Sequence, residues 1–174
     1  MLDFQYCWRS TQRNSDIREY ALEDICRRQM RLSLEYRPSE AWKLLSRVAF
    51  TSFYCDDHSS EEGMMLMQEV EWHTSLCSQP LSLAVRLSFF DVSDYDARIY
   101  SYESDMVYEF SVPMMTGRGM RCYLVCRHNF SEQLSAAFKY AVAYYPENEE
   151  IGSGYDLIIG NVKHECKFQM GLRF

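Results

Sequence analysis

The sequence predicts an α+β fold: an N-terminal strand and two amphipathic helices, then about seven to eight mostly antiparallel strands that form a curved sheet or sandwich. Three observations lead to this fold class. Residues 162–174 alternate between apolar and polar side chains, which is typical of a strand with one buried face. Residues 15–51 instead repeat apolar side chains every three or four positions, as amphipathic helices do. From Met64 onward the period returns to two.

The first strand is predicted at the start of the chain. Leu2, Phe4, Tyr6 and Trp8 alternate there with more polar residues. Because the chain begins and ends in alternating segments, the two terminal strands are candidates to pair with each other.

Two helices are predicted to follow. The first begins with Ser15 as its N-cap and ends before Arg37 and Pro38, because proline interrupts a helix. The second begins near Ser39 and continues to about Thr51. Its apolar stripe consists of Ala41, Leu44, Leu45 and Val48. Helices in this position would pack on one face of the sheet or across its mouth.

The domain prediction is a single domain over residues 1–174, with a helical part at about 15–52 and a β-rich part at about 64–174. The acidic, polar segment 56–63 predicts a loop between these parts. Residues 135–143 fit a strand or a helix equally well. The strands of the β-rich part are expected near residues 66–72, 81–89, 106–112, 120–128, 138–145, 155–159 and 162–174.

Composition indicates an acidic intracellular protein, either cytoplasmic or nuclear. The 174 residues include 47% hydrophobic and 25% charged side chains, and the net charge is −7. This charge argues against extended nucleic-acid binding and against anionic membrane surfaces. We expect the densest basic group, Arg27, Arg28 and Arg31, to form a solvated helix face. The seven cysteines indicate mostly buried thiols in a reducing compartment, and no cofactor is predicted.

Two pairs of cysteine and histidine residues are candidate metal ligands. Cys126 and His128 share one face of a predicted strand, and His164 and Cys166 share one face of another. If these strands were neighbours, the four side chains could surround a tetrahedral zinc ion or supply a cysteine nucleophile with an imidazole base. Otherwise they are core residues. A looser metal candidate is the segment 55–58.

An acidic and aromatic segment is the candidate partner-binding surface. Its residues are Asp94, Tyr95, Asp96, Tyr100 and Tyr102. Such a surface suits a basic or arginine-rich protein. The carboxylates of this region, namely Asp91, Asp94, Asp96, Glu103 and Asp105, are also candidate calcium ligands.

Three functions follow from these patterns. The first is a non-enzymatic protein–protein interaction or regulatory domain, with another protein as partner and a homodimer through an edge strand as one form. The second is a cup for a small apolar ligand, closed by the two helices. The third is a cysteine- or metal-dependent enzyme that uses the Cys/His residues.

Overall fold

The computed structural model describes residues 1–14, 22–55, 58–152 and 154–173, and most of these residues lie in strands. Among them, helical structure is confined to two single 3-10 turns, η1 (Tyr95–Ala97) and η2 (Gly154–Asp156). The protein is therefore a predominantly β structure.

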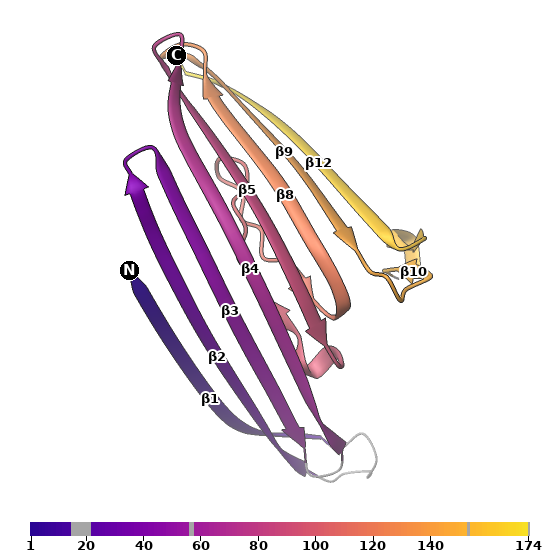
Figure 1. Cartoon of the computed structure of the whole chain (residues 1–174). Helices are drawn as coiled ribbons and strands as arrows, with labels where there is room; N and C mark the ends of the chain where they lie inside the picture. The colour runs from indigo at the N-terminus through magenta and orange to yellow at the C-terminus, as the bar shows by residue number, and fades with distance from the viewer. Residues whose placement is uncertain (15–21, 56–57, 153, 174) are drawn as a thin grey trace.

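Eight strands form one antiparallel sheet in the order β1-β2-β3-β4-β5-β8-β9-β12 (Figure 1). Strands that follow each other along the chain are neighbours in the sheet, and β1 and β12 form its two edges. The strands are β1 (Leu2–Asn14), β2 (Leu22–Ser39), β3 (Trp42–Cys55), β4 (His58–Leu76), β5 (Gln79–Val92), β8 (Gly117–Asn129), β9 (Leu134–Tyr144) and β12 (Val162–Leu172). Between β9 and β12 the chain forms a small hairpin of β10 (Glu150–Ile151) and β11 (Ile158–Ile159).

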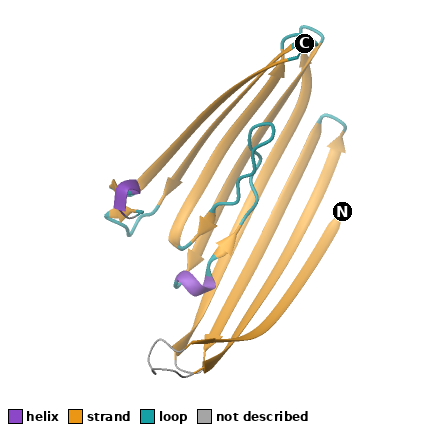
Figure 2. Cartoon of the chain, turned by 180° about the vertical axis from the view of Figure 1, so that it is seen from behind, coloured by secondary structure: helices purple, strands orange, loops and turns teal. Residues whose placement is uncertain are grey.

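Residues 93–116 connect the neighbouring strands β5 and β8 by a long loop that runs out over one face of the sheet and folds back, and we call them the strap (Figure 2). The strap contains η1 and a short strand pair, β6 (Ile99–Tyr100) with β7 (Met114–Met115). It divides the molecule into a covered face, which the strap overlies, and a bare face. Figure 1 shows the sheet with the strap behind it, and Figure 2 shows the strap in front.

The hydrophobic core lies between the strap and the covered face. Ile99 and Met115 of the strap pack there with Met65, Met67 and Phe90 of the sheet. A second buried cluster places Met106 of the strap against β5, β8 and β9. Neighbouring strands bring these side chains to one face because their register pairs equivalent positions across the sheet.

The two predicted helices are wrong, and so is the α+β fold class. Residues 22–39 and 42–55 are the strands β2 and β3. The start of the first predicted helix, residues 15–21, lies outside the described residues. The predicted loop at 56–63 is also wrong from His58 onward, where β4 begins.

The physical reason is that both faces of these strands carry apolar residues. In β3, Leu44 and Val48 lie on the bare face, whereas Leu45 and Ala49 lie on the covered face. Apolar residues on both sides imitate the three- and four-residue spacing of a helix stripe. In β2 the alternation of residues 30–36 was the strand signal.

Other strand predictions have mixed outcomes. The strands expected near 66–72, 81–89, 120–128, 138–145 and 162–174 correspond to β4, β5, β8, β9 and β12. Residues 106–112 instead turn within the strap, where Tyr108 has a φ of 67° that an extended strand does not permit. The segment expected near 155–159 is η2 and the two-residue strand β11. The terminal strands do not pair, because the whole width of the sheet separates β1 from β12.

The contact between strap and sheet gives a direct test of the fold. A Cβ atom added at Gly63 would lie 2.7 Å from the Thr51 hydroxyl oxygen and 2.9 Å from the backbone oxygen of Ala97 in the strap. We therefore expect Gly63→Ala to lower the free energy of unfolding by roughly 1–3 kcal/mol, through overpacking. Urea denaturation measures this change.

The control is Gly171→Ala, whose new Cβ atom would meet only the rotatable hydroxyl of Ser135. Its free energy of unfolding should change by at most about 1 kcal/mol. Equal stability of Gly63→Ala and Gly171→Ala would contradict the close packing of the strap against β3 and β4.

Candidate functional site

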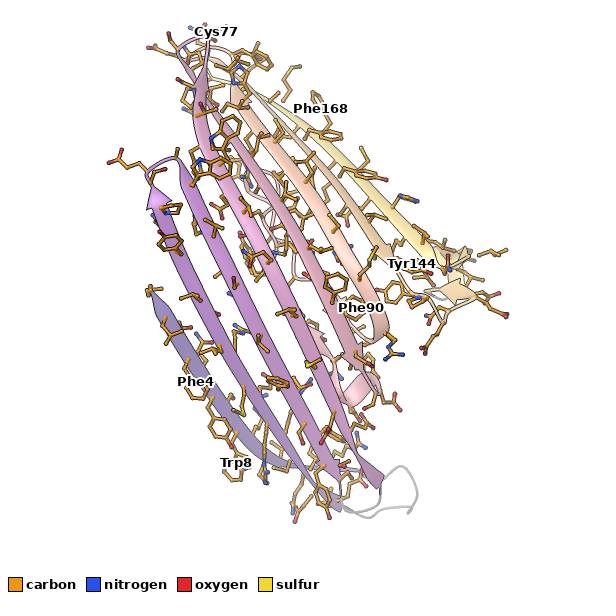
Figure 3. All side chains as sticks on the ribbon, in the orientation of Figure 1. Phe4, Trp8, Cys77, Phe90, Tyr144 and Phe168 are labelled. Atoms are coloured by element: carbon orange, nitrogen blue, oxygen red, sulfur yellow. The ribbon has the colours of Figure 1, made fainter. Side chains whose placement is uncertain are left out.

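The bare face of the sheet is apolar and exposed. One row of apolar and aromatic side chains crosses all eight strands, because each residue pairs with the next in the register. The row consists of Phe4, Leu32, Val48, Leu66, Phe89, Met120, Tyr144 and Val162. Phe4, Leu66 and Phe89 are 60%, 51% and 50% exposed. Figure 3 labels Phe4 near one end of this row and Tyr144 near the other.

Adjacent rows extend this apolar surface along the strands. Trp42 and Trp72 stack with ring centroids 5.8 Å apart, and Phe168 on the edge strand β12 is 69% exposed (Figure 3). Eight strands of eleven or more residues, spaced by about 4.8 Å, span a face on the order of 1,200 Å². The largest apolar patch of a typical monomer is about 300–600 Å².

Charged groups on the bare face are confined to one end. The described Asp, Glu, Lys and Arg side chains there are Asp24, Arg28, Glu62, Asp91 and Arg118. They come from β2, β4, β5 and β8 and share the end of the sheet at which β4 begins and β5 ends. Arg118 pairs there with Asp91 at 3.2 Å. The rest of the face therefore presents apolar side chains with few polar groups between them.

The covered face has the opposite chemistry, because it buries charged groups. Arg86 of β5 lies 2.6 Å from Glu69 of β4, and both are almost fully buried. Tyr123 donates its hydroxyl hydrogen bond to the same carboxylate. Burial raises the pKa of Tyr123, and the neighbouring Glu69 raises it further, so this phenol stays protonated.

Two carboxylates of the strap complete a buried ion-pair network. Glu103 accepts two hydrogen bonds from Arg121 of β8, at 2.7 and 2.9 Å. Asp105 lies 3.1 Å from the ammonium nitrogen of Lys139 and 3.0 Å from that of Lys167. Burial raises the pKa of Asp105, but hydrogen bonds from Lys167, the Met106 backbone N–H and Lys139 outweigh burial, so that its pKa lies below the ordinary value. The network joins the strap to β8, β9 and β12.

The predicted partner-binding residues all belong to the strap, and the polar groups of Asp94, Asp96 and Tyr100 interact within the molecule. Asp94 accepts a hydrogen bond from the Tyr95 backbone N–H, and Asp96 lies 2.9 Å from Arg13. Arg98 stacks over Tyr95 at 4.1 Å and donates to the Tyr100 hydroxyl at 3.0 Å.

Tyr102 completes the predicted group and packs against Phe110.

The candidate calcium ligands do not gather at one place. Glu103 and Asp105 point to cations on the covered face, whereas Asp91 pairs with Arg118 on the bare face.

The four Cys/His candidates lie on the bare face but on strands that are not neighbours. Cys126 and His128 belong to β8, His164 and Cys166 belong to β12, and β9 lies between these strands. His128 contacts the Pro80 carbonyl oxygen at 3.1 Å. The condition for a shared zinc ion or a catalytic pair is therefore not met.

The histidine of β12 has its own partner, because the ring nitrogen of His164 lies 2.7 Å from the Tyr140 hydroxyl. Within the described residues, no three His, Cys, Asp or Glu side chains form a group that could hold a metal ion. The loose candidate segment 55–58 includes residues 56 and 57, which lie outside the described residues. The prediction of mostly buried thiols is wrong, since Cys7, Cys77 and Cys166 are exposed.

The bare face is not among the predicted sites, because the apolar spacing in two of its strands, β2 and β3, predicts helices. The available signal was the apolar half of every alternating segment, beginning with Phe4 and ending with Phe168. Each pattern was interpreted as a strand that buries its apolar side within the chain. The structure turns those sides outward, because the strap packs on the other face.

The fold and this face define the class of structure: an open antiparallel sheet with a charged, strap-covered face and an exposed apolar face. No protein-family model, curated protein or solved structure matches the chain. In the part of the chain that the structure describes, no helix is long and apolar enough to cross a membrane.

Replacing Lys139 tests the buried network. Its side chain is fully buried beside Glu103 and Asp105, so Lys139→Met would leave two carboxylates with less compensation. We expect a loss of about 3–5 kcal/mol in the free energy of unfolding. Lys163→Met, an exposed change on the covered face, should change it by about 0.5 kcal/mol or less. Matching urea midpoints for these variants would contradict the network.

Acid should weaken the same contacts. The pKa of Asp105 is lower in the folded chain than in the unfolded chain, so its contribution is present above pH about 4 and is lost as pH falls through the folded value. We expect the stability difference between wild type and Asp105→Asn to be large at pH 7 and to shrink as the pH falls below about 4 and through the lowered pKa of the folded chain. Urea titrations at each pH measure it, and a difference that does not change with pH would refute the prediction.

Proposed function

We propose that this protein is a non-enzymatic protein–protein interaction domain that associates with a second copy of itself through the bare face. The exposed apolar row that crosses eight strands carries this proposal. Hydrophobic burial drives most protein association, and a face of this composition in water is unfavourable. The two packed sheets would form a β-sandwich between chains instead of within one chain.

The size of the bare face supports a stable dimer. A standard interface buries about 800 Å² on each partner, and obligate dimers bury more apolar surface than that. The bare face, on the order of 1,200 Å², meets this requirement without any contribution from the sheet edges. Two antiparallel sheets pack face to face at a distance of about 10 Å with their side chains interdigitated.

The charge distribution favours a second copy over a charged partner. The apolar rows carry almost no charge with which to attract a basic or an acidic protein. Charged residues occupy only one end of the face, near Asp91 and Arg118. A two-fold axis that runs across the strands would place this end opposite the uncharged end of the other copy, so like charges would not meet.

Packing through the bare face also removes more apolar surface from water than pairing through an edge strand does. Adding a strand to β1 would satisfy the free backbone groups of that edge. It would leave Leu66 and Phe89, near the middle of the sheet, in contact with water. The apolar face therefore favours the sandwich form of the homodimer over the edge-strand form.

A charge placed in the row tests this proposal. Leu66 is 51% exposed in the single chain, so Leu66→Glu leaves the monomer fold intact but would bury a carboxylate at the interface. We expect the wild-type chain to sediment as a dimer and the variant to dissociate at least about 100-fold more readily. Analytical ultracentrifugation measures both.

The control is Ile159→Glu, an equally drastic change at an 87% exposed residue of β11, outside the bare face. It should leave the dimer intact, and circular dichroism should show the same strand content in all three chains. A monomeric wild type would overturn self-association. So would a wild type that enters detergent micelles or lipid vesicles as a monomer, with Leu66→Glu abolishing that binding.

A further inference from the structure

A groove of about 450 Å³ lies on the covered face beside the strap, over β1, β2 and β3. The strap lies over the middle of the sheet and leaves the β1 side of this face open (Figure 2). Ile99 and Tyr100 of the strap form one wall. The side chains of the covered face that line the groove belong to Gln5, Cys7, Gln29, Arg31, Ala49 and Thr51.

Four arginines surround this groove on the covered face. Arg31 lines it directly. Arg9 and Arg27 lie opposite each other on β1 and β2, two residues beyond Cys7 and Gln29. On β3, Arg47 lies two residues from Ala49 and therefore points to the same face. We call Arg9, Arg27, Arg31 and Arg47 the arginine group.

The arginine group lacks the carboxylate partners that Arg86, Arg121 and Lys139 have on this face. Arg86, Arg121 and Lys139 all pair with buried acids, whereas no member of the group has an ion pair within the described residues. Arg27 donates to the Arg98 carbonyl oxygen at 2.8 Å, and its buried Nε has no hydrogen-bond acceptor in the part of the chain that the structure describes.

The nearby carboxylates do not compensate for this charge. Glu23 pairs with Arg13 at 2.6 Å, and Glu35 pairs with Arg37 at 2.9 Å. Glu69 and Asp3 act on Arg47, and Asp96 acts on Arg27, without forming an ion pair with them. Positive charge therefore accumulates at this place in a chain whose net charge is −7.

The accumulated charge is unfavourable for the protein alone. Arg9 and Arg27 are a directly opposed pair of like charges, which destabilises a sheet. Burial lowers the pKa of Arg27, and Arg98 and Arg9 lower it further. Burial also lowers the pKa of Arg47, as do Arg31 and Arg86. An anion bound in the groove would offset the repulsion between these arginines and would raise the lowered pKa values of Arg27 and Arg47.

We propose that the groove binds a small phosphate-bearing molecule, with Arg31 as its central ligand and the other arginines at its two ends. The planar guanidinium group binds phosphate oxygens through two parallel hydrogen bonds. Gln5 and Gln29 add amide donors, and the Tyr100 hydroxyl is a further donor. The volume is in the range of small-ligand sites. This site lies on the opposite side of the sheet from the bare face, so it is independent of the proposed self-association.

Isothermal titration calorimetry with inorganic pyrophosphate at 150 mM salt tests the site. We expect saturable binding to the wild-type chain and at least 10-fold weaker binding to Arg31→Gln. The matched control is Arg28→Gln, which removes the same charge three residues away on β2, from the opposite face of the sheet. It should bind pyrophosphate as wild type does.

Absence of binding to the wild-type chain would overturn the proposal. An equal loss of affinity in Arg31→Gln and Arg28→Gln would also overturn it, because general charge attraction would then explain the binding. Arg9→Gln provides a second variant that does not threaten folding, since Arg9 is exposed on the edge strand. We expect it to weaken binding at least about 3-fold, and unchanged affinity in both Arg31→Gln and Arg9→Gln would contradict the site.

Discussion

The ion pairs between the strap and the sheet are the interaction on which the rest of the structure depends. Arg121 and Lys139 stand on adjacent strands and point to the same face, where Glu103 and Asp105 of the strap meet them. Burying such charges without partners would cost several kcal/mol for each ion. Because the strap supplies the partners, it can lie flat on the sheet and bury Ile99, Met106 and Met115 beneath it.

Because the strap lies on one face of the sheet, the opposite face carries the exposed apolar side chains. A strand directs successive side chains to opposite faces, so the alternation that sends charges towards the strap also sends Phe4, Leu66 and Phe89 away from it. The described chain provides no second layer over those residues. This one-sided arrangement is the basis of the proposed dimer, in which a second copy would cover the bare face and turn two open sheets into a single sandwich.

The strap also explains why the covered face is not uniform. Its carboxylates pair with cations of β8, β9 and β12 and, through Asp96, with Arg13 of β1. They form no ion pair with the arginine group within the described residues. Charge compensation from inside the chain therefore covers only part of the face. The same connection that stabilises the sheet creates a positive groove at its own margin.

Particular residues show how much could be predicted. The alternation around Leu83, Leu124 and Phe168 correctly indicated strands, because in each case one face is consistently apolar. The alternation failed in β3, where Leu44 and Leu45 are both apolar but face opposite sides. Strand order in the sheet could not be read from local patterns at all.

The site predictions were limited by that missing strand order. Cys126 and His128 share a face with His164 and Cys166, as the period of two requires. Whether the two pairs meet depends on which strands are neighbours, and β9 separates them. Asp105 could not be recognised as a buried partner of Lys139 and Lys167, since these residues are far apart in the sequence and only the path of the strap joins them.

The sequence by itself determined that most of the chain after Met64 would be extended and which side chains of each strand would share a face, because both follow from the local geometry of the backbone. Only the tertiary structure decided which of the two faces would be covered. That choice depends on contacts between distant residues, above all the strap carboxylates and the cations of β8, β9 and β12. Once those charges are buried together, the apolar side of the sheet is left facing outward.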